Sequence, residues 1–308
     1  MSRAASERSE NWTTRRLLAW MTEAFTRAGL DSPRLCAELL VSHVIGAERL
    51  RLYTDPDRPA SPLERDALRD LVSRALKHEP VQYLVGQAWF FGLPFRVDRR
   101  VLIPRPSTET IVEELLQHAR AEPGWGVAGG ASGTGLLIAD LCTGSGCLAV
   151  AILKNLAGAR AVATDLSYDA IEIAVENARR HAVFDRIEFQ QGNLLEPLRT
   201  HAAAGSFHAI MSNPPYIPDH EWDEVAPNVR LHEPHLALRA GTEGLDFIAP
   251  ILAGAPDLLR PGGMLLVETA ACHAARAAEL ARDAGLTAVR TVRDLDNRPR
   301  VLIGFRSQ

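Results

Sequence analysis

Cysteine is scarce in this chain of 308 residues, which contains only Cys36, Cys142, Cys147 and Cys272. No two of them form a Cys-x-x-Cys pair, and none clusters with histidine, so the spacing supports neither a zinc site nor a disulfide framework. We therefore expect reduced cysteines that pack as small apolar residues, no bound metal, and a cytoplasmic location.

Long apolar runs are also absent. No stretch is long enough to cross a bilayer as a helix, so we expect no membrane association. The segment from Met1 to Asn11 is polar and has no apolar centre, which argues against a secretory signal. We expect residues 1 to about 12 to be frayed.

The chain lacks an excess of basic charge. It has 34 Lys and Arg against 38 Asp and Glu, a net charge of −4. A general nucleic-acid binder would usually be basic, so we expect no stable binding of nucleic acid. Residues 1–100 are mildly basic, with 16 basic and 13 acidic residues. This segment either faces an RNA-associated partner or shows ordinary surface scatter.

The first part of the chain has the apolar spacing of helices. A composition of 46% apolar residues in 308 provides enough core for two domains. Ser32-Pro33 and Ser61-Pro62 are typical helix starts. We predict a small helical bundle, in which these apolar residues have helix spacing: Leu17, Leu18, Trp20, Met21, Phe25, Leu35, Leu39, Leu40, Val44, Leu68, Leu71 and Leu76.

Strand-forming residues follow from Ala88 to Ile103, with Gly92 and Pro94 as turn residues. This pattern predicts a β-hairpin that bridges two domains. We therefore divide the chain into residues 1–87, a hairpin linker over residues 88–105, and a domain over residues 106–308. Within the last, we expect a helix to begin between Ile111 and Leu116 and a surface loop over residues 124–135, which are rich in Gly and Ala.

From Leu136 onward, predicted strands alternate with helices. This alternation is typical of an α/β fold with a mostly parallel sheet that helices cover on both faces. Ligands of such sheets bind at the carboxyl ends of the strands. We predict seven strands, Leu136–Leu141, Arg160–Asp165, Ile187–Gln190, Phe207–Ser212, Met264–Glu268, Ala288–Arg293 and Val301–Phe305, with helices that include Tyr168–His181 and Ala274–Ala284.

A glycine-rich turn follows the first of these strands, with Gly144 and Gly146 ahead of an apolar helix. Glycines let the backbone come close to a ligand, and a helix N-terminus presents free N–H groups. The next strand ends at Asp165, where a carboxylate suits ribose hydroxyls. The alternatives are a turn without a ligand, and an aspartate that caps the following helix.

The stretch Ser212-Asn213-Pro214-Pro215-Tyr216 ends the fourth predicted strand. Asn213 has a side-chain carbonyl, and Pro214 has a backbone carbonyl but no N–H. Two acceptors held at the end of a strand can bind both hydrogens of one –NH₂ group, and Tyr216 can lie flat against its plane. The motif predicts a site that aims an amide or amine nitrogen at an electrophile.

Together, these motifs resemble those of the HemK/PrmC family. Its members are Rossmann-like class I methyltransferases that depend on S-adenosyl-L-methionine and methylate the side-chain amide of glutamine in translation proteins. Three further stretches support the resemblance, which covers nearly all of the chain from about Thr13: Glu79–Gly86, Phe91–Val97 and Val101–Pro106.

The resemblance implies roles for the residues that match the family motifs. The cofactor-binding residues would be Asp140, Cys142, Thr143, Gly144, Ser145, Gly146, Asp165, Asn193, Leu194 and Asn213. The catalytic residues would be Asn213, Pro214, Pro215 and Tyr216. Glycine is frequent in the family where Cys142 stands, which implies a backbone contact there and no thiol chemistry. Asn193 would contact adenine, with a local turn as the alternative.

The family string Pro-Arg-Pro-x-Thr-Glu matches Arg105, Thr108 and Glu109, whereas Ser107 stands where the family usually has Glu. Thr108 and Glu109 also suit the first turn of a helix. Glu233-Pro234 resembles a family segment beside the substrate channel, and a plain loop turn is the alternative.

The resemblance also implies the substrate, which is the glutamine of the Gly-Gly-Gln motif in class 1 peptide chain release factors. The helical residues 1–87 would recognise that partner, and we expect a monomer. Three alternatives stay open. They are a glutamine methyltransferase of a large-subunit ribosomal protein, an adenine-specific DNA methyltransferase, which also uses Asn-Pro-Pro-Tyr, and a non-catalytic binding protein.

Overall fold

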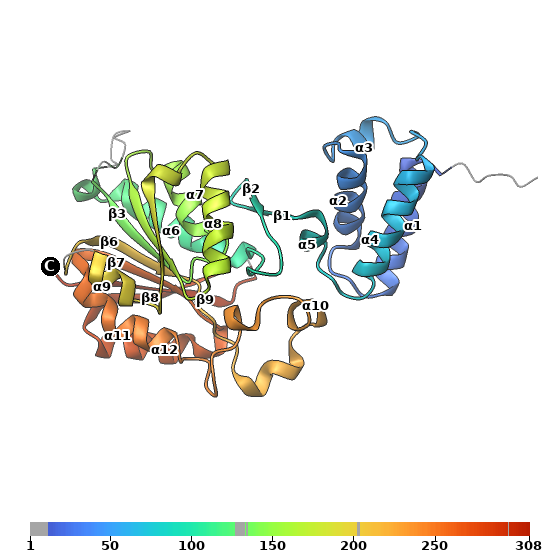
Figure 1. Ribbon diagram of the computed structural model, residues 1–308. Coiled ribbons are helices and arrows are strands. Elements are labelled where there is room, and N and C mark those ends of the chain that lie inside the picture. The colour runs from blue at the N-terminus through green and yellow to red at the C-terminus, as the bar shows by residue number, and fades with distance from the viewer. Residues whose placement is uncertain (1–11, 127–132, 134, 202–203, 295) are drawn as a thin grey trace, which may run out of the picture. The chain divides into compact units, whose positions relative to one another are not determined.

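The computed structural model of the chain describes residues 12–126, 133, 135–201, 204–294 and 296–308 (Figure 1). The expected frayed segment therefore lies almost wholly outside the described residues. The chain divides into two compact units. The first runs to Gly86 and includes Pro227–His232, and the second comprises Gln87–Ala226 and Glu233–Gln308. No helix among the described residues is long and apolar enough to cross a membrane.

The first unit is helical. Thr13 caps its first helix by accepting a hydrogen bond from the Arg16 N–H, and Ser61 and Glu64 form a capping box at its fourth. Pro33 and Pro62 begin helices as predicted. The helices are α1 (Thr14–Arg27), α2 (Pro33–Ile45), α3 (Arg51–Thr54), α4 (Pro62–Ala75), α5 (Val81–Val85) and α10 (Pro227–Arg230).

Three of the apolar residues with helix spacing lie outside the core of this unit. Trp20 is 44% exposed, Leu35 39% and Leu76 38%. A helix advances about 100° per residue, so Trp20 lies to one side of the buried stripe of α1, and Leu35 lies opposite the buried stripe of α2. Leu76 follows the last residue of α4.

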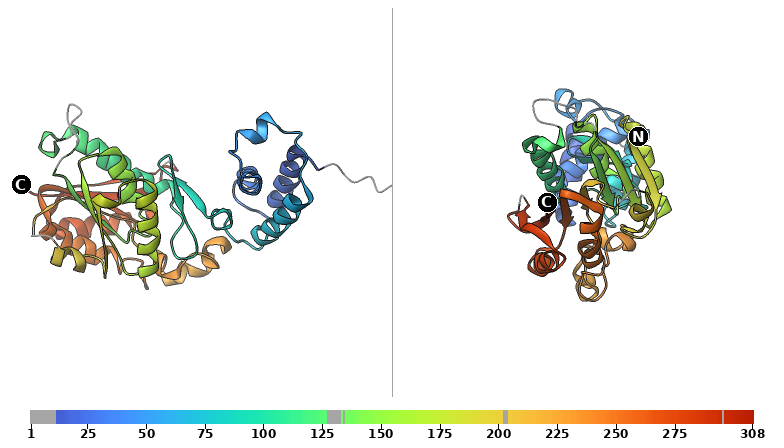
Figure 2. Two further views of the ribbon diagram at one scale, coloured as in Figure 1. Left: turned by 45° about the horizontal axis from the view of Figure 1, so that its top comes forward. Right: turned by 90° about the vertical axis from the view of Figure 1, so that its left-hand side faces the viewer.

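The second unit contains a seven-stranded sheet in the order β5-β4-β3-β6-β7-β9-β8 (Figures 1 and 2). The first five strands in that order are parallel, and β9 is antiparallel to both of its neighbours. The mostly parallel fold is confirmed. The strands are β3 (Leu137–Leu141), β4 (Arg160–Asp165), β5 (Ile187–Gln191), β6 (Phe207–Ser212), β7 (Leu259–Glu268), β8 (Leu286–Arg293) and β9 (Pro299–Arg306).

Helices cover both faces of this sheet (Figure 2). Ile138 and Ala139, which are neighbours on β3, belong to different buried clusters, because successive side chains of a strand point to opposite faces. One cluster contains residues of α6 and α7, and the other contains residues of α11 and α12. The α-helices are α6 (Glu109–Ala121), α7 (Cys147–Asn155), α8 (Tyr168–Arg180), α9 (Glu196–His201), α11 (Ile248–Leu258) and α12 (Ala274–Asp283).

Short 3-10 helices connect several of these elements. They are η1 (Pro106–Thr108), η2 (Pro123–Trp125), η4 (Phe184–Arg186), η5 (Asp219–Glu224), η6 (His235–Ala237) and η7 (Ala271–His273).

The hairpin consists of β1 (Gln87–Phe90) and β2 (Leu93–Arg96), and it belongs to the second unit. Phe91 and Gly92 form its turn, and both have positive φ. The prediction that Pro94 is a turn residue is wrong. Pro94 pairs with Trp89 in a two-stranded sheet, where an edge strand tolerates proline.

Two further predictions need correction. Strand β7 begins at Leu259 and not at Met264, because a register shift opposite Phe207 and Ala209 accommodates the turn-like Pro261-Gly262-Gly263. The predicted surface loop over residues 124–135 contains Trp125, which is only 1% exposed. Most of that loop lies outside the described residues.

Candidate active site

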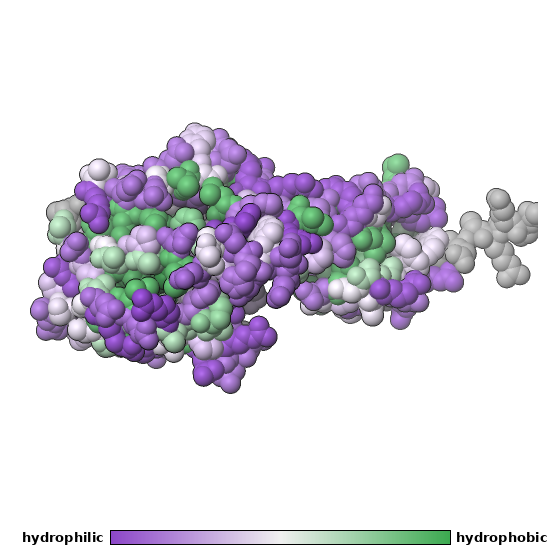
Figure 3. All heavy atoms as spheres, turned by 90° about the horizontal axis from the view of Figure 1, so that it is seen from below, coloured by the Kyte–Doolittle hydropathy of each residue, from purple (hydrophilic) through white to green (hydrophobic). Residues whose placement is uncertain are grey.

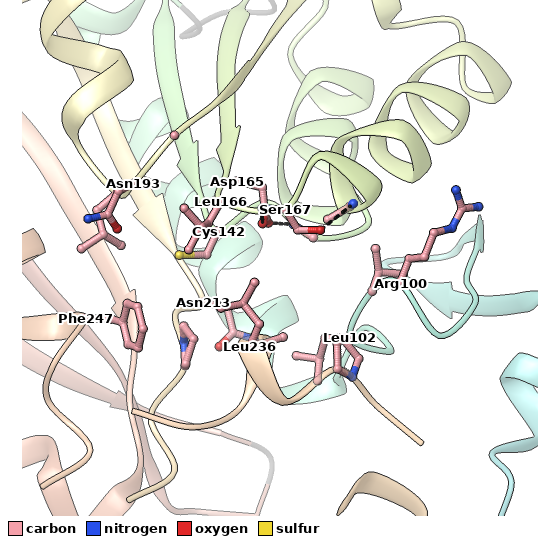
Figure 4. Close-up of a pocket in the computed structure, with 18 residues that line it drawn as sticks. Arg100, Leu102, Cys142, Asp165, Leu166, Ser167, Asn193, Asn213, Leu236 and Phe247 are labelled. Carbon is pink, nitrogen blue, oxygen red and sulfur yellow. Dashed lines mark hydrogen bonds between the residues drawn. The ribbon is translucent and has the colours of Figure 1, made fainter. Parts of the chain in front are cut away.

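A pocket lies at the carboxyl ends of the parallel strands in the second unit (Figure 4). It encloses about 740 Å³, part of it open to solvent. Neighbouring parallel strands end at one edge of the sheet, so motifs far apart in sequence meet there. Its lining includes Cys142 and Gly144 after β3, Asp165 at the end of β4 with Leu166 and Ser167 after it, Gly192 to Leu194 after β5, Asn213 and Pro215 after β6, and Arg100, Val101, Leu102, Ala170, Pro234, Leu236, Ala237 and Phe247.

Six of the predicted site residues are not part of this lining: Asp140, Thr143, Ser145, Gly146, Pro214 and Tyr216. Asp140 is fully buried under the glycine turn. Its Oδ2 accepts hydrogen bonds from the Thr143 hydroxyl at 2.6 Å and from the Ala149 N–H at 3.1 Å. Burial raises the pKa of this carboxyl to about 7. The geometry gives Asp140 a role in shaping the turn.

The backbone of the glycine turn is left-handed at three positions, Cys142, Gly144 and Gly146. A Cβ at Gly146 would lie 3.1 Å from the Cβ of Ala174 on α8, so only glycine allows this close packing. Cys142 has φ of 55°, a conformation that glycine adopts without strain. This explains in physical terms why glycine suits position 142.

We expect Cys142→Gly to leave cofactor affinity within a few-fold of the parent, because the predicted contact is made by the backbone. The relief of strain, about 1–2 kcal/mol, is offset by the greater entropy of unfolded glycine. Cys142→Val should lower the melting temperature, because a β-branched residue resists a left-handed φ. Calorimetric titration and thermal unfolding measure both effects. Loss of cofactor binding in Cys142→Gly would show that the thiol itself matters.

Asp165 joins the ends of β3 and β4. Its Oδ2 accepts the Gly144 N–H and its Oδ1 accepts the Ser167 N–H, each at 2.9 Å. The cap of α8 is Ser167, whose hydroxyl accepts from the Ala170 N–H, so the alternative of Asp165 as the cap is wrong. Each carboxylate oxygen can accept a second hydrogen bond, which leaves capacity for two hydroxyls in the pocket.

Leu166 and Phe247 are among the apolar wall residues that the sequence analysis missed. Leu166, which directly follows Asp165, is 46% exposed and lines the pocket with Asn193 and Leu194. Phe247 lies across from them (Figure 4). A leucine directly after the strand-ending acid was a usable signal in the sequence. Phe247 offered none, because it precedes α11 in a stretch without a recognised motif.

Asn213 projects from the end of β6 into the pocket wall (Figure 4). Its Nδ2 donates a hydrogen bond to Oγ1 of Thr108, at 3.0 Å. Pro214 is buried behind it, and the hydroxyl of Tyr216 donates to Oε1 of Glu268 at 3.4 Å. Burial raises the pKa of Tyr216 above its usual range, which keeps the phenol neutral.

Glu268, at the end of β7, is a further residue that the sequence analysis missed. It is fully buried, and its Oε2 accepts from the Thr108 hydroxyl at 2.6 Å. Its Oε1 accepts from the Ser107 hydroxyl at 3.3 Å, in addition to Tyr216. Burial raises the pKa of Glu268, while these hydroxyls and the charge of Arg300 act in the opposite direction. Ser107, where the family usually has Glu, thus serves as one donor to this carboxylate.

A third buried carboxylate, Glu233, holds another part of the pocket wall. Glu233 pairs with Arg105 at 2.5 Å and accepts the Ile103 N–H at 3.0 Å. These contacts join the segment that carries Val101 and Leu102 to the segment that begins at Pro234. In the described residues, no group of three or more His, Cys, Asp or Glu side chains is arranged to hold a metal ion.

Residues 16–86 match the family model of the PrmC N-terminal domain, and residues 138–232 match that of a methyltransferase domain. The second unit also has the fold of solved methyltransferases. A human methyltransferase 10 domain containing protein, 17% identical, superposes with a TM-score of 0.50 over 70% of this chain and 89% of that chain. At this identity the likeness shows the fold alone.

Curated relatives extend the match over both units. The release factor glutamine methyltransferase of Chlorobaculum tepidum is 42% identical over 269 residues, which are 87% of this chain and 88% of the relative. The enzyme of the same name from Geobacter sulfurreducens is 41% identical over 266 residues, 85% of this chain and 86% of the relative. The resemblance inferred from the motifs is confirmed, and this chain belongs to the family of release factor glutamine methyltransferases.

Proposed function

We propose that this chain transfers a methyl group from S-adenosyl-L-methionine to the side-chain amide nitrogen of the glutamine in the Gly-Gly-Gln motif of class 1 peptide chain release factors. The observation that supports it most is the pairing of β3 with β6, in which Leu141 lies opposite Ser212. The next residues are Cys142 and Asn213. A turn suited to the methyl donor and an asparagine suited to the acceptor thus begin one strand spacing apart, about 4.8 Å.

The residues of the pocket fit this cofactor. Asp165 would accept the two ribose hydroxyls, and the apolar side chains of Leu166 and Phe247 would flank the adenine, with Asn193 at its edge. The backbone at Cys142 and Gly144 would lie along the methionine part. When bound, the cofactor supplies a highly electrophilic methyl group on its sulfonium.

The acceptor needs mainly placement, because conjugation with the carbonyl deactivates an amide nitrogen. Oδ1 of Asn213 and the backbone carbonyl of Pro214 would accept the two amide hydrogens and leave the nitrogen facing the methyl group. Tyr216, which is half-buried, would pack against the amide plane. The nitrogen becomes acidic once it is methylated, so its proton can leave after transfer without a dedicated base.

We further propose that the first unit recognises the release factor. Large apolar side chains reach its surface, among them Leu50 at 70% and Leu63 at 82% exposure, and Figure 3 shows apolar residues on this unit among hydrophilic ones. Exposed apolar residues that gather in patches often mark protein contacts. A monomer in the cytoplasm that binds no nucleic acid stably remains our expectation.

The test is incubation of the purified enzyme with cofactor labelled in its methyl group and, separately, a class 1 release factor, a large-subunit ribosomal protein and DNA. We expect label in the release factor alone. Label only in the ribosomal protein would keep the chemistry and change the substrate. Label in DNA, or in none of the three, would contradict the proposed function.

A further inference from the structure

We infer that Thr108, held by the buried carboxylate of Glu268, fixes the side-chain amide of Asn213 with its oxygen and not its nitrogen toward the acceptor. Thr108 would be a positioning residue, because it acts on the substrate only through Asn213. This inference rests on the proposed function and adds to it the device that orients the acceptor site.

The direction of the hydrogen bonds follows from counting protons. A threonine hydroxyl has one proton, and the Glu268 carboxylate is the shared acceptor of three hydroxyls. The Thr108 proton therefore goes to Oε2 of Glu268, at 2.6 Å. The Thr108 oxygen is then an acceptor for Asn213, and only Nδ2 of Asn213 can donate to it, at 3.0 Å.

The alternative orientation of Asn213 is disfavoured. If the amide turned over, Oδ1 would face Oγ1 of Thr108, and two acceptors would meet without a proton between them. With Nδ2 committed to Thr108, Oδ1 has no hydrogen-bond partner among the described residues. That oxygen is thus available to the amide hydrogen of a substrate glutamine.

The carboxylate that sets this direction is itself well held. Glu268 and Thr108 are 0% and 2% exposed, so solvent does not compete for their hydrogen bond. Ser107 and Tyr216 donate to the other oxygen of Glu268, so hydroxyl donors meet both of its carboxylate oxygens. Glu268 does not line the pocket. A role as a base that takes the substrate proton is therefore not supported by its position.

The test compares Thr108→Val, which keeps the side-chain shape but removes the hydroxyl, with Thr108→Ser, which keeps the hydroxyl. We expect Thr108→Val to lower kcat for release-factor methylation by roughly tenfold to hundredfold, because a misaimed acceptor costs rate. Cofactor affinity and KM should change by no more than a few-fold. Thr108→Ser should recover most of the rate.

The decisive measurement is a double-mutant cycle with Asn213→Ala. If Thr108 acts through Asn213, Thr108→Val should lower kcat less than about twofold once Asn213 is already alanine. Equal losses in both backgrounds, or a Thr108→Val enzyme with kcat within twofold of the parent, would overturn the inference.

The Glu268→Gln variant provides a second test of the inference if Thr108→Val does not fold. A glutamine amide can donate to Thr108, and Thr108 can then hydrogen-bond to the Asn213 amide in either orientation. We therefore expect a smaller loss of kcat than in Thr108→Val. This loss should again disappear in the Asn213→Ala background. A loss that persists there would overturn the inference. Release-factor methylation by the parent enzyme distinguishes a failure of the proposed function from a failure of the orienting role of Thr108. If the parent enzyme methylates no release factor, the proposed function fails. If it does so normally while the cycle is additive, only the orienting role fails.

Discussion

Replacement of Asn213 by alanine is expected to lower kcat by about 100-fold or more while cofactor affinity stays within a few-fold of the parent. The change deletes one of two acceptors for the substrate amide, and small errors of aim at the reacting atom cost about two orders of magnitude in rate. The cofactor pocket should persist, because its other walls come from the ends of β3, β4 and β5. Single-turnover kinetics and calorimetric titration measure the two effects separately.

The Asn213→Asp variant is a stricter test of the role of Asn213 in holding the substrate amide. It keeps the shape and an acceptor, but it sets a carboxylate oxygen against Oγ1 of Thr108, whose only proton already goes to Glu268. Burying an additional, unpaired carboxylate beside Glu268 is costly, so we expect methyl transfer to collapse. The exposed Asn155→Ala is the matched control and should change nothing. Near-normal turnover in Asn213→Ala would show that the interpretation of Asn-Pro-Pro-Tyr is wrong.

Replacement of Asp165 by alanine is expected to weaken cofactor binding by well over tenfold. The carboxylate would provide two charge-assisted hydrogen bonds to the ribose, each worth about 1.5–3 kcal/mol. It also accepts the N–H groups of Gly144 and Ser167, so its loss should loosen the glycine turn as well. Calorimetric titration measures the affinity, and circular dichroism checks the fold.

Two further variants serve as comparisons for the cofactor affinity of Asp165→Ala. Asp165→Asn keeps one acceptor and the side-chain shape, so its affinity should lie between those of the parent and the alanine variant. Asp169→Ala removes an exposed acid from the first turn of α8 and should leave affinity unchanged. If Asp165→Ala bound the cofactor as tightly as Asp169→Ala does, the ribose role of Asp165 would have to be abandoned.

The sheet could be predicted from the sequence almost strand by strand. Both β4 and β6 have the predicted bounds, because buried parallel strands are short apolar runs that end at polar residues. Strand β7 was predicted too short, since Pro261-Gly262-Gly263 looks like a turn in isolation. Its pairing with β6 overrides that local preference.

The parts of the site that belong to local motifs were also within reach. Cys142, Gly144, Asp165 and Asn213 line one pocket because each ends or follows a parallel strand. Glu268 was not within reach, because in sequence it is only the last residue of a strand. Its role depends on its hydrogen bond with Thr108, which lies 160 residues earlier in the chain. No sequence periodicity relates the two positions. Contacts at that separation depend on how η1 packs over the sheet.

The most direct test of methyl transfer to a glutamine amide is tandem mass spectrometry of a class 1 release factor after incubation with the enzyme and S-adenosyl-L-methionine. We predict one added methyl group, on the side chain of the glutamine in the Gly-Gly-Gln motif. A release factor with glutamate at that position keeps the size of the side chain but has no amide nitrogen, and it should remain unmodified. A methyl group on any other residue, or on the glutamate variant, would contradict this mechanism.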